Sequence, residues 1–458
     1  MTDNTQLSTT GRDADLLNEL FQKADRILVK KLSKNDRDWA RHSNKHQAGV
    51  YIPHENRDGG FFPALKRMNR SDPDADPIWE VYFSTKWPQA APAARAKESR
   101  LVHYTSKGQE THITRLPASV FSELLPASFL VMGRVHAEGG TAFECLTIDS
   151  ASEEASLLAE MFEIGPDFLI GEFDPKEVWK SEHDRILDFA EQLIAAWQDG
   201  RIDLFARDHA AMPATIDLAN LARQEYLAKQ GLTSLNPFEL DAPGDALRDI
   251  SRNVEWELFR KFQRRERAVA LVRLVLGDEP TSISLTDVIR RLVDTLPAID
   301  ALMLSASQQR KARAGYSYEH HIEAMLSDGA IPFEKQVVIA AKKRPDFILP
   351  SLGFMEAETS KEKTALILSA KTTLRERWKQ VEREKSGRNL YLTTVDENIA
   401  GNAIEDMASF GVWLVIPESL KKSKVAEYEG HKNVLSFREF CDSVLKPNLD
   451  AWSGRTLL

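Results

Sequence analysis

Short apolar runs alternate with clusters of Asn, Gly, Pro and Asp over the first third of the chain. Runs of this length, bounded by turn-forming residues, are typical of β-strands. Between Ile27 and Thr147 they read RILVKKL, AGVYIP, IWEVYFST, RLVHYT, THITRL, SFLVMGRVH and FECLTI. We therefore expect an all-β or β-rich barrel in this region.

Beyond this region the apolar residues recur at helical spacing. The pattern predicts helices over 152–162 and 183–198. Gly and Pro gather between residues 230 and 245, where we expect the main linker. Two more amphipathic helices are predicted, over 254–276 and 286–302, and we interpret both as core helices.

From residue 315 onward, predicted strands and helices alternate along the chain. The strands are expected at 333–340, 345–349, 365–370, 389–394 and 412–416, and the helices at 318–326, 374–385 and 399–410. This alternation indicates a three-layer α/β domain. We divide the chain into an N-terminal domain (1–180), an acidic helical segment with the linker (181–245) and a C-terminal domain (246–458).

Composition limits the classes of protein that fit. The chain has 458 residues, 42% of them hydrophobic, so it can bury more than one core. We expect a cytoplasmic protein with no membrane partner, because no apolar run approaches the roughly 18 residues of a membrane helix and no signal segment is evident. Cys145 and Cys441 are too few for a disulfide framework or a structural zinc site. A metal, if used, is expected to have oxygen ligands.

Charge is unevenly distributed along the chain. The formal net charge is −9, which alone argues against a nucleic-acid partner. Residues 147–210, however, carry 16 acidic and 5 basic side chains, whereas 309–388 carry 16 basic and 11 acidic ones. The stretch 30–45 adds six basic residues against two aspartates. These blocks are either solvated faces or two basic binding zones separated by an acidic one.

The candidate chemistry lies in KKRPDFILP and LILSAKTT. Asp346 begins one short apolar strand, and Lys371 follows another, 25 residues later. Adjacent strands would bring the acid and the amine to one edge of a sheet. Phosphodiester hydrolysis needs oxygen ligands for a divalent ion and a cation that orients the attacking water. The alternative is a turn aspartate and an unrelated surface lysine.

A charged cluster follows Lys371. Thr373 and Glu376 have the spacing of a capping box that opens a helix. Arg375 and Arg377 stand in the first turn of that helix, and arginine reads guanine in the major groove. The cluster is thus either a reader of a G·C pair or a solvated group of charges.

Many nucleases of the PD-(D/E)XK type carry their second metal carboxylate two residues before the lysine. Here Ser369 occupies that position, so the second carboxylate must come from elsewhere. The candidates are helical or loop glutamates: Glu384 downstream, Glu319 and Glu323 upstream, and Glu356 and Glu358 in the loop between the strands. A glutamate on an exposed helical turn is ordinarily only a surface residue.

Several separated stretches resemble the EcoRII-type (type IIE) restriction endonucleases of the PD-(D/E)XK nuclease superfamily. RKARAGYSYEHHIEAML, KKRPDFILPS and SAKTTLRERWKQVEREK are similar to the catalytic domain of that family. LSKNDRDWARHSNKHQAGVYIP and YTSKGQETHITR are similar to its effector-binding domain, and RNVEWELFRKFQRRERAVALV to the joining helical segment. The resemblance implies a restriction-endonuclease-like α/β C-terminal domain, with a mixed sheet flanked by helices, and an N-terminal β-rich DNA-binding pseudobarrel.

The resemblance also assigns residues to three sites. The implied catalytic residues are Glu319, Asp346, Lys371 and Glu384, of which Asp346 and Glu384 would hold Mg²⁺. The implied base-reading residues are Arg375, Glu376 and Arg377. The implied effector-DNA contacts are His46, Tyr51, Glu110 and His112.

The implied activity is cleavage of double-stranded DNA by a magnesium-dependent, type II site-specific endonuclease that is paired with a DNA methyltransferase. A homodimer is expected because a double-strand cut at a symmetric site needs two active sites related by the DNA dyad. By resemblance, a second copy of the site would activate the enzyme. Two alternatives stay open: a repair or structure-specific nuclease without base reading, and a DNA-binding regulator with an inert nuclease domain.

Overall fold

The chain forms two compact units. In this computed structural model the described residues are 10–41, 49–69, 76–108, 110–137, 140–339, 344–358, 364–374, 378–379 and 388–455. The first unit contains the chain up to Glu182 with two short later segments, Glu397–Ala400 and Ser423–Glu427, and the second contains the rest. The chain passes from one unit to the other within helix α5 (Pro175–Gln198).

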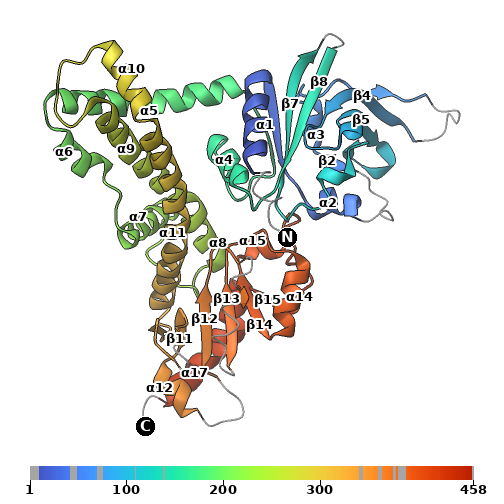
Figure 1. Cartoon of the computed structure of the whole chain (residues 1–458). Helices are drawn as coiled ribbons and strands as arrows, with labels where there is room; N and C mark the ends of the chain where they lie inside the picture. The colour runs from blue at the N-terminus through green and yellow to red at the C-terminus, as the bar shows by residue number, and fades with distance from the viewer. Residues whose placement is uncertain are drawn as a thin grey trace, which may run out of the picture. The chain divides into compact units, whose positions relative to one another are not determined.

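The first unit is built on one large sheet (Figure 1). Its strands pair in the order β2-β6-β5-β4-β8-β7-β1-β9, with β3 beside β4, and the pairs are antiparallel except for β4 with β8. The bounds are β1 (Arg26–Lys31), β2 (Val50–Ile52), β3 (Lys66–Arg67), β4 (Ile78–Lys86), β5 (Ala96–Tyr104), β6 (Thr111–Thr114), β7 (Phe129–Ala137), β8 (Gly140–Ile148) and β9 (Ile170–Phe173). The predicted β-rich region is confirmed, with a strand in each of the seven apolar runs.

Strand β1 is buried on both faces of this sheet. Leu28 packs into one apolar core and its neighbours Ile27 and Val29 into another, because successive side chains of a strand point to opposite faces. Helices α1 (Thr10–Lys23) and α4 (Glu153–Met161) close the second core. Burial on both sides explains why three consecutive residues of this strand, Ile27, Leu28 and Val29, are apolar.

Helices connect the two sheets of the molecule. After α5 they are α6 (Ile202–Phe205), α7 (Thr215–Gln230), α8 (Pro243–Asp249), α9 (Glu255–Leu276), α10 (Leu285–Asp294) and α11 (Leu296–Asp328). The helix predicted over 254–276 is confirmed by α9. Residues 230–245, expected to be a linker, instead pack within the second unit: Leu235 is 1% exposed in the core that Ala222 of α7 and Ala246 of α8 also form.

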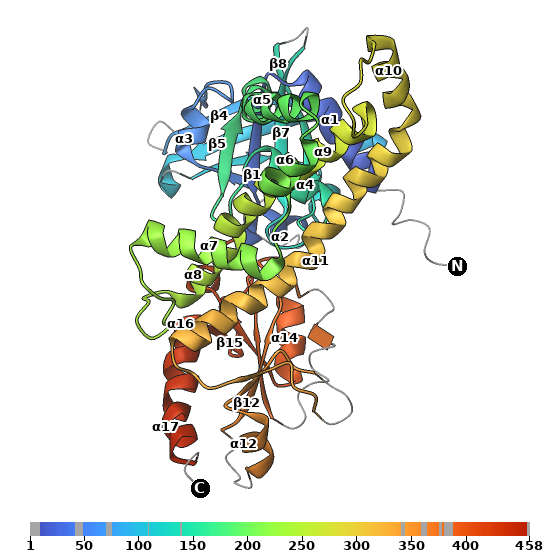
Figure 2. The ribbon, with the colours of Figure 1, turned by 90° about the vertical axis from the view of Figure 1, so that its left-hand side faces the viewer.

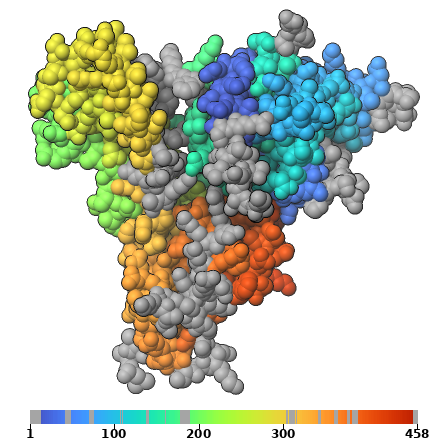
Figure 3. All heavy atoms as spheres, in the orientation of Figure 1, coloured from blue at the N-terminus to red at the C-terminus, as the bar shows by residue number. Residues whose placement is uncertain are grey.

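The helix predicted over 286–302 is wrong in two respects. It divides at Thr295, whose hydroxyl donates to Arg291 O at the end of α10, and Pro297 opens α11. A proline is tolerated in the first turn of a helix but interrupts a continuing one. Nor is α10 a core helix: Leu285 and Ile289 are 76% and 57% exposed on this surface helix, drawn yellow in Figure 3.

The second unit is centred on a six-stranded mixed sheet. Its order is β10-β11-β12-β13-β14-β15, antiparallel from β10 to β12 and parallel from β12 to β15. The strands are β10 (Glu334–Lys335), β11 (Phe347–Leu349), β12 (Leu366–Ala370), β13 (Asn389–Thr393), β14 (Val412–Ile416) and β15 (Val434–Ser436). Strand β10 is far shorter than the predicted 333–340, because Gln336 has a positive φ of 52° and ends the extended run.

Helices cover both faces of this sheet. The long helix α11 lies on one side and α14 (Gly401–Ser409) on the other (Figure 2). The remaining helices are α12 (Leu352–Ala357), α15 (Glu418–Lys421), α16 (Phe437–Phe440) and α17 (Lys446–Arg455). The predicted α/β class, a mixed sheet flanked by helices, is confirmed.

Within the described residues, no helix is both long enough and apolar enough to cross a membrane.

Candidate active site

Asp346 and Lys371 lie together at one edge of the second sheet. Strands β11 and β12 are antiparallel neighbours, with Phe347 opposite Leu368, so the residue before β11 and the residue after β12 meet. Lys371 Nζ donates to Asp346 Oδ2 over 2.7 Å, and Ala370 N donates to the same oxygen over 2.8 Å. The side chains are 25% and 13% exposed, so both are fixed and still reachable from solvent.

Glu319 of α11 stands beside this pair. Its side chain is buried, and its Oε2 accepts a hydrogen bond from Gln336 Nε2 over 3.3 Å. Burial raises the pKa of Glu319, and the nearby carboxylate of Asp346 raises it further, while Lys371 opposes both effects. The predicted catalytic residues from the helix, from the start of β11 and from the end of β12 are therefore neighbours.

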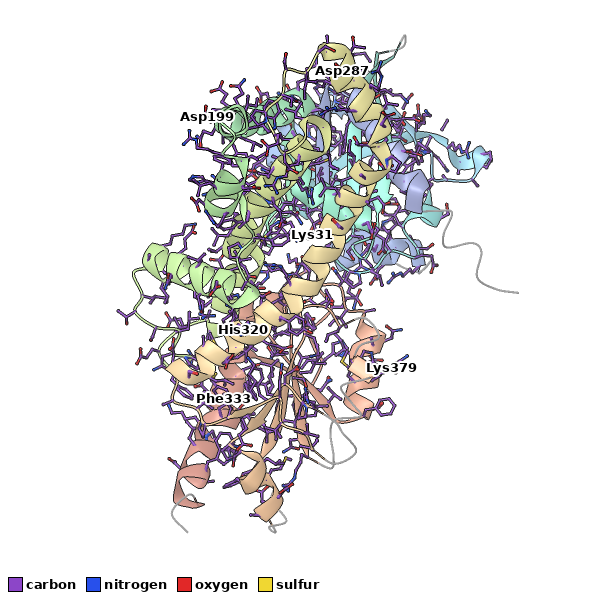
Figure 4. All side chains as sticks on the ribbon, turned by 60° about the vertical axis from the view of Figure 1, so that its left-hand side comes forward. Lys31, Asp199, Asp287, His320, Phe333 and Lys379 are labelled. Atoms are coloured by element: carbon purple, nitrogen blue, oxygen red, sulfur yellow. The ribbon has the colours of Figure 1, made fainter. Side chains whose placement is uncertain are left out.

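Glu323, one helical turn further on, is engaged elsewhere. Lys335 Nζ donates to its Oε2 over 2.5 Å, and His320 Nδ1 lies 3.4 Å from the same oxygen. Burial raises the pKa of Glu323, but the hydrogen bond and charge of Lys335 outweigh it and leave that pKa lowered. Figure 4 labels His320 on α11. This ion pair makes Glu323 a weaker candidate for a metal ligand than Glu319.

The loop glutamate Glu358 has a structural role. Its carboxylate accepts from Thr364 N and Thr364 Oγ1, over 2.6 and 2.9 Å, and pairs with Arg388. These bonds close the loop before β12 and occupy the carboxylate. Glu356 is exposed on α12.

Several predicted residues lie outside the described part of the chain: Glu384, the base-reading group Arg375, Glu376 and Arg377, and the effector-site residue His46. The start of the base-reading segment is described, however. Lys371 N donates to Thr393 O over 3.0 Å, and Leu374 N donates to Asp396 Oδ2 over 2.8 Å. Both ends of the short segment before Arg375 are thus attached to the neighbouring strand and the loop after it.

In the first unit, Tyr51 and His112 face each other across strands β2 and β6. They are register partners, and their ring centroids lie 5.8 Å apart. Glu110 is exposed just before β6, and its carbonyl oxygen lies 3.0 Å from His103 Nδ1. Three of the four residues assigned by resemblance to effector DNA thus come from β2 and from β6 or its start.

Three of the six basic residues of 30–45 are buried and cannot face DNA, whereas Lys34 and Arg41 are exposed and Lys45 lies outside the described residues. Lys30, Lys31 and Arg37 are 6%, 3% and 0% exposed. Lys30 pairs with Asp36 over 2.7 Å, Lys31 Nζ donates to Pro166 O, and Arg37 donates to Leu124 O. Long basic side chains are rarely buried unless paired, and each of these three has a hydrogen-bonding partner.

The carboxylates at the sheet edge fit a magnesium ion. Magnesium prefers oxygen ligands and commonly uses one or two protein carboxylates plus water. Among the residues that the structure describes, nothing donates a hydrogen bond to Asp346 Oδ1 or Glu319 Oε1, so one oxygen of each acid remains available. No cluster of three or more His, Cys, Asp or Glu ligands occurs within the described ranges, and the third predicted acid, Glu384, lies outside them.

Some residues around the site carried no recognisable sequence signal. Gln336, Tyr318 and Thr393 belong to no charged motif, and they lie 10, 28 and 47 residues from Asp346. Tyr318 and Thr393 also look like ordinary core positions of a helix and a strand. Only the folded arrangement shows that their polar groups reach the sheet edge.

The chain is similar in sequence to known type II restriction enzymes. Residues 282–441 match the family model described as EcoRII C terminal. The type II restriction enzyme EcoRII of Escherichia coli is 26% identical over 404 residues, covering 86% of this chain and 88% of that protein. The type II restriction enzyme SsoII of Shigella sonnei is 29% identical over 219 residues, covering 45% of this chain and 70% of that protein.

Two solved protein–DNA complexes also match parts of the chain. Metal-depleted Ecl18kI in complex with uncleaved, modified DNA matches with 23% identity and a TM-score of 0.44, covering 57% of this chain and 84% of that one. The PspGI–substrate DNA complex matches with 18% identity and a TM-score of 0.39, covering 51% of this chain and 93% of that one.

A mixed α/β sheet that pairs an aspartate and a lysine at one edge is the arrangement of the PD-(D/E)XK class of nucleases. The family match and the curated relatives narrow this class. Residues 282–441 match the EcoRII C-terminal family model, and most of the chain is similar in sequence to the type II restriction enzyme EcoRII.

Proposed function

We propose that this protein is a type II site-specific restriction endonuclease that hydrolyses phosphodiester bonds of double-stranded DNA. The observation that carries the proposal is the Lys371–Asp346 pair of 2.7 Å, at a solvent-reachable sheet edge within the EcoRII C-terminal domain. The relation to EcoRII and SsoII supports the same activity.

The side chains at the sheet edge have separate roles in this proposal. Asp346 and Glu384 would hold a magnesium ion, and Glu319 stands beside Asp346. When bound, the ion supplies charge stabilisation at the scissile phosphate and lowers the pKa of a bound water. Lys371, held by Asp346, orients the attacking water and balances negative charge. Arg375, Glu376 and Arg377 follow Lys371 closely in sequence and read base edges in the major groove.

The assembly and its partners follow from the reaction. A double-strand cut at a symmetric site needs two active sites, so the enzyme acts as a homodimer. A DNA methyltransferase that modifies the same site protects the cell's own DNA in the cytoplasm.

The first unit would hold a second copy of the recognition site and regulate cleavage. Its binding surface includes Tyr51, His112, Glu110 and His46. The adjacent rings of Tyr51 and His112 support this role, whereas the buried basic residues of 30–45 do not contribute to it. A stimulating oligonucleotide would act through a coupling free energy typically of about 1 to 3 kcal/mol.

The activity is tested by incubating the full-length protein with DNA of known sequence in Mg²⁺ and mapping the ends. Discrete ends at one short sequence are expected. Cleavage at random positions, or only at mismatches and branches, would favour a repair or structure-specific nuclease. No cleavage together with specific binding would favour a regulator with an inert nuclease domain.

The regulatory role has its own test in the full-length protein. An added oligonucleotide carrying the site should accelerate cleavage of single-site DNA, and Tyr51→Ala with His112→Ala should abolish the acceleration. His136→Ala is the control, because His136 is an 80% exposed histidine on the same unit. An acceleration that persists in the double variant would overturn the proposed effector site.

A further inference from the structure

The catalytic lysine and the helical glutamate come from different elements, yet both are connected to Thr393 of β13. Thr393 O accepts the N–H of Lys371 over 3.0 Å, as the parallel register of β12 with β13 allows. The side-chain hydroxyl of Thr393 makes a second bond: its Oγ1 lies 2.9 Å from the hydroxyl oxygen of Tyr318. Tyr318 immediately precedes Glu319 in α11, so one threonine bonds to both sides of the site.

This hydroxyl pair is fully enclosed. Tyr318 is 1% exposed and Thr393 is 0% exposed, within the apolar core that includes Leu368, Ala370 and Val395. A Phe and a Val of the same shapes would fill this space without polar groups, and such a double replacement is often nearly neutral for stability. Packing alone therefore does not explain why Tyr and Thr, rather than Phe and Val, occupy these two positions.

A hydrogen bond fixes the relative position of a helix and a strand more closely than apolar packing does. Apolar contacts between a helix and a sheet tolerate small shifts, whereas a hydrogen bond of 2.9 Å fixes one atom of α11 against one atom of β13. Because α11 passes along the face of the sheet (Figure 2), a slide or rotation of the helix at this point would move Glu319 relative to Asp346 and Lys371.

We propose that Tyr318 and Thr393 are positioning residues of the active site, which set the placement of Glu319 against the Asp346–Lys371 pair through their buried hydroxyl–hydroxyl bond. The inference rests on the proposed nuclease function, because it gives Glu319 a part in metal binding and cleavage. It assigns a role to two buried residues that do not themselves bind the metal or contact the DNA in the proposed reaction.

Three variants separate positioning from folding. Tyr318→Phe and Thr393→Val each leave one buried hydroxyl without its partner, so each should lower the Tm by a few degrees. The double variant removes both hydroxyls and should recover most of the Tm. Its cleavage rate should stay about tenfold below wild type, since small misplacements of catalytic groups have effects of this order or larger.

Metal binding provides a readout besides activity. The rise in Tm on titration with Mg²⁺ should need about fivefold more Mg²⁺ in the double variant, because stabilisation by a ligand follows its concentration relative to its Kd. Binding to the cognate duplex without metal should be unchanged. Ser99→Ala is the matched control: it breaks a buried hydroxyl pair of 2.7 Å with Thr85 in the other unit and should leave the Mg²⁺ dependence as in wild type.

Two results would overturn the positioning role. One is a double variant that recovers cleavage and Mg²⁺ dependence together with its Tm, since this would mean that the pair only stabilises the fold. The other is a wild-type protein whose Tm does not respond to Mg²⁺, which would remove the site itself. A wild-type protein that responds to Mg²⁺ but cuts no DNA would count against the proposed function alone, and the Mg²⁺ titrations would still decide the inference.

Discussion

The two units each contain a Lys–Asp pair with the same separation of 2.7 Å between Nζ and Oδ2, Lys371–Asp346 and Lys30–Asp36. Their surroundings differ. The first pair is 25% and 13% exposed, and the second is 7% and 0% exposed. The same Nζ–Oδ2 distance therefore occurs at an accessible sheet edge and in an interior.

The carboxylates of the two pairs also differ in how many of their oxygens accept hydrogen bonds. Asp36 Oδ1 accepts from Tyr51 N, and Asp36 Oδ2 accepts from Ser33 N and Ser33 Oγ as well as from Lys30. In Asp346 both described donors share Oδ2, which leaves Oδ1 available. A saturated, buried carboxylate organises the chain around it, whereas a half-satisfied, accessible one can bind a ligand. Exposure and free acceptor capacity, rather than the pair itself, separate structure from chemistry.

The largest expected effect is at the accessible pair. Lys371→Ala and Asp346→Ala should each reduce the cleavage rate at least about a thousandfold, because each removes a group that stabilises the transition state or holds the metal. Specific DNA binding should remain measurable by gel shift in both variants. A Lys371→Ala protein that cuts at the wild-type rate would end the assignment of the active site.

The buried pair should fail in a different way. Asp36→Ala leaves Lys30 as an uncompensated buried charge, so the free energy of unfolding of the first unit should fall by about 3 to 5 kcal/mol. Urea unfolding measures this loss. Glu19→Ala, which breaks the exposed Lys23–Glu19 pair, is the control and should change stability by less than about 1 kcal/mol. Equal small effects of the two variants would mean that burial does not distinguish the pairs.

Base reading is predicted to contribute less per residue. If Arg375 and Arg377 contact guanine, each alanine variant should lose about 1 to 3 kcal/mol of binding free energy, with relaxed discrimination at one base pair. Competition binding with single-base variants of the site measures this. Equal weakening on cognate and random duplexes, with a shallower salt dependence, would assign these arginines to the phosphate backbone instead.

The smallest expected effect concerns Gln336 at the accessible site. Its φ of 52° is unfavourable for a side-chain-bearing residue, so Gln336→Gly should raise stability by about 1 kcal/mol. The same change removes the donor to Glu319 and should lower cleavage a few-fold. Gln336→Asn tolerates the backbone but shortens the amide, and should behave likewise in cleavage. Gains in both stability and cleavage would show that the conformation serves no function.

Local pattern was sufficient for much of the fold. The apolar runs predicted seven strands of the first unit but not β3 or β9, and the alternation after residue 315 predicted a layered α/β domain without β15. The spacing of apolar residues within a strand is a local pattern, so these elements could be predicted from the sequence. The pattern failed at Thr295 and Gln336, where a helix divides and a strand ends because of backbone geometry at one residue.

Part of the candidate site could likewise be predicted from the sequence, and part could not. Asp346 and Lys371 could be paired from the sequence, because each adjoins a short apolar strand and adjacent strands join their ends. The burial of Lys30 and Arg37, and the bonds of Thr393 to Tyr318 and Lys371, could not. The sequence shows which residues are charged but not which residues they pair with. The pairing depends on contacts between residues that are far apart in the chain. The sequence by itself thus determined the elements and the reactive residue types, and the tertiary structure decided which charges remain accessible and which hydrogen bonds position them.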